Sequence, residues 1–186
     1  MGTIGVTGHR LLPDPAAMAQ AVDAALDRIV ALAGWDGATV VTSLAEGADR
    51  LVADRARARP GWAIEVVLPL EVDDYAADFA DAASVDAYRE LLDTAASVTV
   101  VGPAATREDA YLAAGLAVLR RSDVLVAVWD GLPARGVGGT ADIVGRARAE
   151  GRPLVWLSTD PSTGAPAETD ERLALLGHRN VPGDRP

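Results

Sequence analysis

The chain has 186 residues, of which 49% are hydrophobic, so its length and composition suit one globular domain with a full core. It contains no cysteine and no lysine, which excludes disulfides, thiolate metal ligands, cysteine nucleophiles, Schiff-base chemistry and the lysine of a Walker-type phosphate loop. Its formal net charge of −10 disfavours broad binding to nucleic acid or anionic membranes, because both rely on cationic side chains, but leaves room for a small ligand in a locally positive pocket.

Short β-branched runs alternate with helix-like segments from the N-terminus onwards. The first strand is predicted at Thr3–Thr7, followed by a helix that Asp14 caps, Pro15 opens and Gly34 ends. The remaining predicted elements are strands at Ala38–Ser43, Trp62–Leu68, Ser97–Val101, Asp123–Trp129 and Pro153–Ser158, and helices at Ala48–Arg59, from near Ser84, from a capping box at Thr106 and Asp109 to about Arg120, and at Gly139–Glu150. The segment PLEVDDYAADFADAA between two of them is predicted to be a loop.

This alternation predicts an α/β, Rossmann-like, doubly wound fold: a mainly parallel sheet of about six strands with helices on both faces. The strands read as continuous apolar runs, which is typical of strands covered on both sides. Residues 1–158 are predicted to form this domain. Residues 159–186 are predicted to be a polar C-terminal tail with a weak helix at Glu171–Leu176.

Three loops that follow predicted strands combine glycine with small polar or ionisable residues. In an open parallel sheet, ligands bind beyond the carboxyl ends of the strands, near the switch in strand order. The residues that these loops would bring there are Gly8, His9 and Arg10 after the first strand, Ser43, Glu46, Gly47 and Asp49 after the second, and Trp129, Asp130, Gly138, Gly139 and Thr140 after the fifth.

The last of these loops, DGLPARGVGGTADIV at residues 130–144, precedes a predicted helix whose N-terminus would direct free N–H groups and a positive dipole at an anion. The Thr140 hydroxyl could add a donor, and Arg10 or Arg135 could pair with a phosphate. Each feature also has a purely structural explanation. Glycine loops serve turns, His9 can be a simple loop hydrogen-bond partner, and acidic residues favour a helix start. Only the convergence of three loops predicts an anion site.

Tyr111 lies within an apolar helix and is predicted to be a core residue. Trp35, Trp62 and Trp156 are predicted to serve packing, whereas Trp129 stands at the carboxyl end of a strand, beside the predicted site.

The motifs VTGHR, TSLAEGADRLVA and SDVLVAVWDG…GVGGTADIV resemble the SLOG superfamily over roughly residues 1–158. That group includes the LOG-type phosphoribohydrolases, the DNA-processing protein A group and nucleotide-sensing domains. The resemblance implies a Rossmann-like fold that binds a nucleotide or a nucleotide-derived ligand, commonly in a dimer.

The enzymatic members of that superfamily carry a motif PGGxGTxxE, whose glutamate works with an arginine of the preceding helix to cleave the bond between base and ribose 5′-phosphate. Matching Gly139 and Thr140 to the GT puts Ile143 at the glutamate and Ala114 at the arginine. If the chain does cleave such a bond, the catalytic carboxylate would have to come from another position in the predicted loops. The candidates are Glu46, Asp49, Asp130 and Asp142.

The sequence therefore predicts binding rather than hydrolysis, in a sensor or regulatory domain. Gly138, Gly139 and Thr140 would hold phosphate, the Gly8–Arg10 loop would complete the anion pocket, and the loop with Ser43, Glu46 and Gly47 would line the ribose or base side. The alternative is a LOG-like nucleoside 5′-monophosphate phosphoribohydrolase with a relocated carboxylate, for which Glu46 and Asp142 are the first candidates.

Neither a cofactor nor a metal is predicted, and DNA binding like that of the DNA-processing branch is disfavoured by the net charge. The expected partners are a nucleotide-type small molecule and a second copy in a homodimer. No apolar run approaches the roughly 20 residues that span a bilayer, and MGTIGVTGHR lacks the layout of a signal peptide. The predicted location is cytoplasmic, without a membrane partner.

Overall fold

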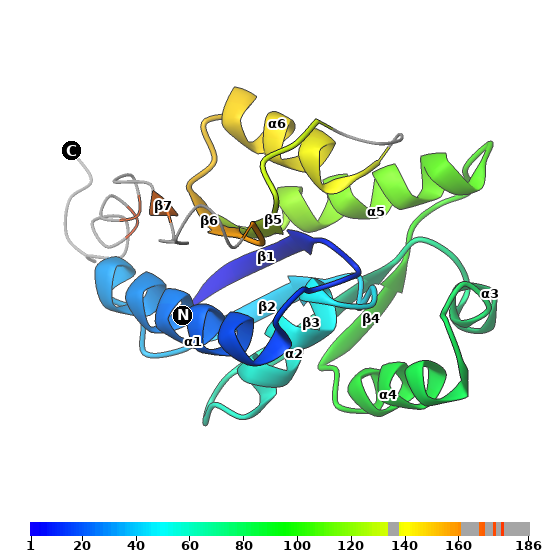
Figure 1. The fold of residues 1–186 in the computed structure, drawn as a ribbon, viewed down its shortest axis with the longest axis horizontal. Coiled ribbons are helices and arrows are strands. Elements are labelled where there is room, and N and C mark those ends of the chain that lie inside the picture. The colour runs from blue at the N-terminus through cyan, green and yellow to red at the C-terminus, as the bar shows by residue number, and fades with distance from the viewer. Residues whose placement is uncertain (134–137, 161–167, 170–172, 174–175, 177–186) are drawn as a thin grey trace, which may run out of the picture.

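A computed structural model describes residues 1–133, 138–160, 168–169, 173 and 176 (Figure 1). One sheet runs through the molecule in the order β4-β3-β2-β1-β5-β6-β7. Six strands are parallel, namely β1 (Gly2–Gly8), β2 (Ala38–Thr42), β3 (Ala63–Leu68), β4 (Ser97–Val100), β5 (Val124–Trp129) and β6 (Leu154–Ser158). The two-residue β7 (Glu168–Thr169) pairs antiparallel with β6.

Helices cover both faces of the sheet, as Figure 1 shows. Their bounds are α1 (Pro15–Ala33), α2 (Ala48–Arg57), α3 (Val72–Ala76), α4 (Ala82–Asp93), α5 (Arg107–Arg120) and α6 (Thr140–Ala149). Apolar residues of α1, α2 and α4 pack on one face, and those of α5 and α6 on the other. The predicted Rossmann-like α/β fold is therefore confirmed.

The local signals read from the sequence set the ends of the helices. The Asp14 side chain accepts a hydrogen bond from Ala17 N (2.9 Å), Pro15 takes the first helical position, and Gly34 ends α1 in the left-handed conformation. Thr106 caps α5 by accepting from Asp109 N at 3.1 Å. These caps satisfy amide groups that the helices cannot pair internally.

The segment between β3 and α4 differs from its predicted loop. It contains the short helix α3, and α4 begins at Ala82, where the Asp81 side chain accepts from Ser84 N at 2.8 Å. A five-residue helix is too short to show a helical hydrophobic period, so sequence patterning misses it. Edge strand β4 also differs from a fully covered strand, because Val98 is 44% exposed.

Parts of the predicted polar tail contact the domain. Thr169 and Glu168 pair with Val155 and Trp156 of β6. Leu173 is buried in the core on the α1 side of the sheet. The domain boundary at residue 158 and the tail remain predictions, and most of the weak helix predicted at Glu171–Leu176 lies outside the described residues.

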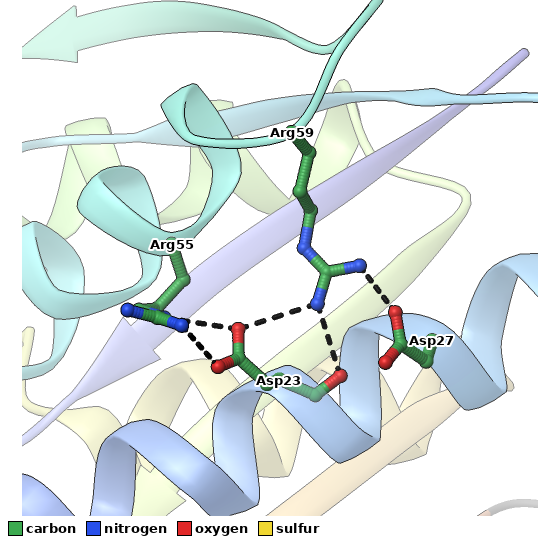
Figure 2. A network of polar contacts seen from close by, with 4 residues as sticks. All are labelled: Asp23, Asp27, Arg55 and Arg59. Carbon is green, nitrogen blue, oxygen red and sulfur yellow. Dashed lines mark hydrogen bonds and ion pairs between the residues drawn. The ribbon is translucent and has the colours of Figure 1, made fainter.

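An ion-pair network joins α1 to α2 (Figure 2). Asp23 accepts from Arg55 Nε at 2.9 Å and from Arg59 Nη2 at 3.2 Å, and Arg59 also pairs with Asp27. The hydrogen bonds from Arg55 hold the pKa of Asp23 below its usual value. Pairs this near the surface contribute about 0.2–1 kcal/mol each, so the network adds only modestly to the stability of the fold.

The strand order reverses between β1 and β5. From β1 the chain proceeds to β2, β3 and β4 on one side of the sheet, whereas β5 and β6 lie on the other. Gly8 is in register with Val128, so the carboxyl ends of β1 and β5 meet at one edge. This is the position where open α/β sheets bind ligands. Within the described part of the chain, no helix is both long and apolar enough to cross a bilayer.

Candidate functional site

A cleft of about 380 Å³ opens at the switch in strand order, a volume suited to a small ligand. Most of the predicted site residues line it: Gly8, His9, Arg10, Ser43, Trp129, Asp130, Gly138, Gly139 and Thr140. Asp49, which follows the second predicted strand and was a candidate carboxylate, also lines it, as do Tyr75, Glu108 and Tyr111, which sequence reasoning did not place at the site. Glu46, Gly47 and Asp142 are not among the lining residues.

Two glycines let the loop after β1 lie on the N-terminus of α2. A Cβ on Gly8 would come within 2.4 Å of the Ala48 Cβ. Gly47 has φ +78°, and a Cβ there would come within 2.3 Å of Arg10 O and 2.4 Å of His9 O. In this close arrangement Ala48 N donates to His9 O at 3.0 Å. Gly47 therefore does not line the cleft but allows the loop with His9 and Arg10 to pack closely against the start of α2.

His9 connects the loops after β1 and β5. Its amide donates to Val128 O at 2.9 Å, and its Nε2 lies 3.2 Å from Asp130 N and 3.1 Å from Asp130 Oδ1. One ring nitrogen cannot accept and donate at once. A neutral His9 accepts from the Asp130 amide, and a protonated His9 donates to the Asp130 carboxylate. In both states the residue holds the two loops together.

The N-terminus of α6 opens onto the cleft. The amides of Thr140 and Ala141 belong to the first turn of α6 and have no acceptor within the helix, and the N-cap residue Gly139 makes no side-chain hydrogen bond among the described residues, so an anion in the cleft can accept from them. Gly138 has φ +81°, and a Cβ there would come within 2.9 Å of Leu112 N on α5. Glycine is thus needed for the loop to reach α5. Arg135, the other predicted phosphate partner, lies outside the described residues.

Asp142 is occupied at the rim of α6. Its Oδ2 accepts from Gly138 N at 2.9 Å, and its side chain is exposed. The carboxylate therefore fixes the end of the glycine loop. Its candidacy as a relocated catalytic group remains a prediction that no contact with the cleft supports.

Ile143, which the sequence resemblance matches to the glutamate of the LOG-type motif, makes an apolar contact. Ile143 is 2% exposed and lines the cleft beside Gly115, whose added Cβ would come within 2.7 Å of Ile143 Cδ1. Ala114 instead packs under α5 against Val41 and Val67. The residue of α5 that faces Ile143 is therefore Gly115, and not Ala114, which precedes it. Successive residues of a helix point about 100° apart, so Ala114 faces the sheet while Gly115 faces α6.

Asp49 stands at the end of the cleft nearest β2. It is 5% exposed, and its Oδ2 accepts from Thr42 Oγ1 at 3.0 Å and from Ser43 N at 3.1 Å. Burial raises the pKa of the Asp49 carboxyl to about 6, against the opposing effect of these hydrogen bonds. Asp49 thus shapes the loop after β2 and also presents a readily protonated carboxyl to the site.

The raised pKa predicts how Asp49 affects stability with pH. A proton binds more tightly to the folded than to the unfolded protein, so the contribution of Asp49 is fully present below about pH 4 and is lost as the pH rises through about 6. The free energy of unfolding, relative to that of the Asp49→Asn variant, is expected to fall by about 2 kcal/mol between pH 4 and pH 7. Urea titrations of both proteins across this range measure it.

The comparison with Asp49→Asn cancels the other titrating groups. Asp23, Glu46 and Asp78 have lowered pKa values and act in the opposite direction, but equally in both proteins. A difference that grows with pH would mean that the hydrogen bonds to Asp49 outweigh its burial.

Glu46 points to the start of α4. Its Oε1 accepts from Ala80 N at 3.0 Å and from Ser84 Oγ. Burial opposes its ionisation, but these hydrogen bonds prevail and keep the pKa of Glu46 below its usual value. Arg50 binds the same region by donating to Ser84 O at 2.7 Å and to Leu44 O at 2.9 Å. The hydrogen bonds of Glu46 and Arg50 thus link the start of α4 to the loop after β2.

Arg10 and two tyrosines form the wall on the α3 and α5 side. The Arg10 guanidinium lies 5.6 Å from the centre of the Tyr111 ring, and Tyr111 donates from its hydroxyl to Asp78. The Tyr111 ring lies 5.8 Å from the Tyr75 ring. Tyr111 is half-buried: it packs against the core cluster that contains Tyr75, in line with the sequence prediction, and it also lines the cleft. Tyr75 comes from α3, which gave no sequence signal.

The Trp129 indole anchors the loop after β5. Its Nε1 donates to Leu132 O at 2.9 Å, and its ring lies 5.7 Å from that of Trp156. Only 8% of Trp129 is exposed. Its main role is therefore to fix the loop that carries Asp130, with one edge at the cleft.

Comparisons with known proteins support the fold and nothing finer. No protein-family model matches the chain, and no curated protein matches it. The X-ray structure of DNA processing protein A (DprA) from Streptococcus pneumoniae aligns with a TM-score of 0.56 at 17% identity, over 96% of this chain. The chain therefore shares its fold with part of that structure. It spans only 55% of the length of the DprA structure.

A second solved structure, the structural-genomics target TM1055, aligns with a TM-score of 0.48 at 20% identity. It covers 83% of this chain, which in turn covers 72% of that structure. Among the described residues, no group of three or more histidine or acidic side chains is arranged to hold a metal ion.

Proposed function

We propose that this SLOG-type domain binds a nucleotide or a nucleotide-derived small molecule in the cleft and acts as a sensor or regulatory domain. The observation that carries the proposal is that the N-terminus of α6 lines the same cleft as Arg10 and His9, at the switch in strand order. Free helix amides and a guanidinium are the groups that hold phosphate in proteins without a lysine loop.

The phosphoryl group would sit at Gly138, Gly139 and Thr140, with Arg10 as its charged partner. The Thr140 hydroxyl adds a donor to the amides of the first turn. His9, held at Asp130, adds a second positive charge only when it is protonated. The nucleoside part would extend along the cleft toward Ser43 at the end of β2.

Hydrolysis of a nucleoside 5′-monophosphate is the alternative, and one observation keeps it open. Asp49 and Asp130 both line the cleft, and burial raises the pKa of Asp49 to about 6, a value useful for proton transfer. Against it, the wall at Ile143 and Gly115 is apolar. Cleavage of an N-glycosidic bond needs a positioned carboxylate near the reacting carbon, and we therefore favour binding.

The test is a thermal-shift screen with AMP, GMP, ATP, ADP-ribose and NAD, followed by chromatography of each ligand that stabilises the protein. A ligand at a hundredfold excess over its Kd stabilises by about 2.7 kcal/mol. Stabilisation with the ligand recovered intact is the result expected. Release of free base would establish the hydrolase instead, and no shift with any nucleotide would refute a phosphate site.

The proposed partners follow from charge and resemblance. The printed name of DprA refers to DNA processing in that protein. Here the net charge of −10 favours a small molecule over DNA. A gel-retardation assay with single-stranded DNA tests this preference. Retardation at low salt that is lost at high salt would show that the protein binds DNA. A homodimer in the cytoplasm is the proposed working state.

A further inference from the structure

Tyr75 carries a hydroxyl group without a partner at the wall of the cleft. The residue is fully buried in α3, and its hydroxyl oxygen is closed to solvent and makes no hydrogen bond among the described residues. Its side chain is nevertheless one of those that line the cleft. Buried polar atoms are nearly always paired in folded proteins, so an unpaired one at a ligand cleft indicates a partner that arrives from outside.

The surroundings of Tyr75 define what that partner must be. Asp49 and Ser43 line the same end of the cleft, at the carboxyl end of β2. Burial raises the pKa of Tyr75 well above its usual value, and the negative charge of Asp49 adds to this effect. The phenol remains neutral and able both to donate and to accept.

The distance between the two ends of the cleft fits one class of ligand. The first turn of α6 belongs to the connection that follows β5, and β1 separates β5 from β2. Adjacent strands lie about 4.8 Å apart, so the Asp49 end is roughly 10 Å from the β5 side. A nucleoside 5′-monophosphate places its phosphoryl group and the polar groups of its sugar or base across a span of this order.

We propose that the Tyr75 hydroxyl and the Asp49 carboxylate bind a hydrogen-bond donor on the nucleoside part of the ligand. This inference rests on the phosphoryl site proposed above and assigns the opposite end of the same ligand. A ribose hydroxyl and a base amino group share the required chemistry: each donates to the carboxylate and can pair with the phenol.

The Tyr75 oxygen is closed to solvent, so a ligand can reach it only if neighbouring side chains move. Arg10 is exposed and rests on the ring of Tyr111, which packs against Tyr75. A phosphoryl group at α6 attracts the Arg10 guanidinium, which draws it off this wall. Binding of the phosphoryl group at α6 thereby exposes the Tyr75 end of the cleft to the nucleoside part of the ligand.

The test compares Tyr75→Phe with Tyr88→Phe. Tyr88 also has a buried, unpaired hydroxyl and packs against Tyr75 at 5.8 Å, but it is not among the residues that line the cleft. Removing an unsatisfied hydroxyl should leave each variant as stable as the parent, or more stable. Calorimetric titration with AMP is expected to show roughly fivefold weaker binding to Tyr75→Phe and unchanged binding to Tyr88→Phe.

The probes separate the two sources of the donor. If ribose 5-phosphate shows the same fall on Tyr75→Phe, the donor is a ribose hydroxyl; if only AMP or GMP shows it, the donor is on the base. Equal binding of every probe to the parent and to Tyr75→Phe would overturn this inference while leaving the phosphoryl site intact. Failure of all probes to bind the parent would overturn both.

Discussion

Replacing Gly47 with alanine is expected to destabilise the protein by about 3 kcal/mol or more. Gly47 has φ +78°, which L residues rarely adopt, and its added Cβ would come within 2.3 Å of Arg10 O and 2.4 Å of His9 O. Both obstacles are backbone atoms, so no side chain can rotate to make room. The loop after β1 must shift, and the hydrogen bond from Ala48 N to His9 O is lost with it.

Gly34→Ala is the matched control for Gly47→Ala. Gly34 has a similar φ of +65°, but a Cβ there meets nothing within 4 Å. Only the conformational strain remains, about 1 kcal/mol. Thermal unfolding is expected to show a midpoint roughly 10 °C lower for Gly47→Ala and about 3 °C lower for Gly34→Ala. Equal falls would mean that the loop after β1 does not rest on Gly47.

Replacing Gly139 with aspartate is expected to weaken binding of a phosphoryl ligand at least about a hundredfold. Gly139 caps α6 without a side-chain hydrogen bond and has φ −71° and ψ 170°, which suit any residue. An aspartate there would bond the first-turn amides that the ligand needs and place a negative charge beside it. Two like charges about 4 Å apart repel by about 4 kcal/mol near a protein surface.

Folding separates this loss from simple damage to the domain. Aspartate is a preferred N-cap, so the unfolding free energy of Gly139→Asp is expected to stay within about 1 kcal/mol of the parent's. Gly139→Asn is the control because asparagine caps equally well without the charge. Calorimetric titration with AMP should show a smaller loss for asparagine than for aspartate. Identical affinities in all three proteins would place the phosphoryl group elsewhere.

The sequence predicted the elements whose signals are local. The ends of α1 follow from Asp14, Pro15 and Gly34, and each of these residues does in the structure what its type favours. The six parallel strands follow from apolar runs between helix-like segments. Two elements escaped, α3 and β7, because five and two residues are too few for any periodicity to register.

The side of the cleft on which each loop residue falls could not be predicted. Glu46 and Asp49 stand three residues apart, on either side of the start of α2, yet Glu46 reaches Ser84 of α4 while Asp49 lines the cleft. Which carboxylate faces a ligand depends on where α4 packs, and α4 is more than thirty residues away in the sequence. The sequence therefore identified loops that line the cleft, but not which of their side chains face it.

The sequence by itself determined a Rossmann-like sheet and the loops at its carboxyl edge, because caps, turns and strand periodicity are properties of neighbouring residues. The tertiary structure alone decided that Gly115 faces Ile143, that Gly47 supports the loop after β1 from behind and that Tyr75 brings an unpaired hydroxyl to the cleft. These facts arise from contacts between segments far apart in the chain. Their geometry is set by how helices pack on the sheet, which no local pattern encodes.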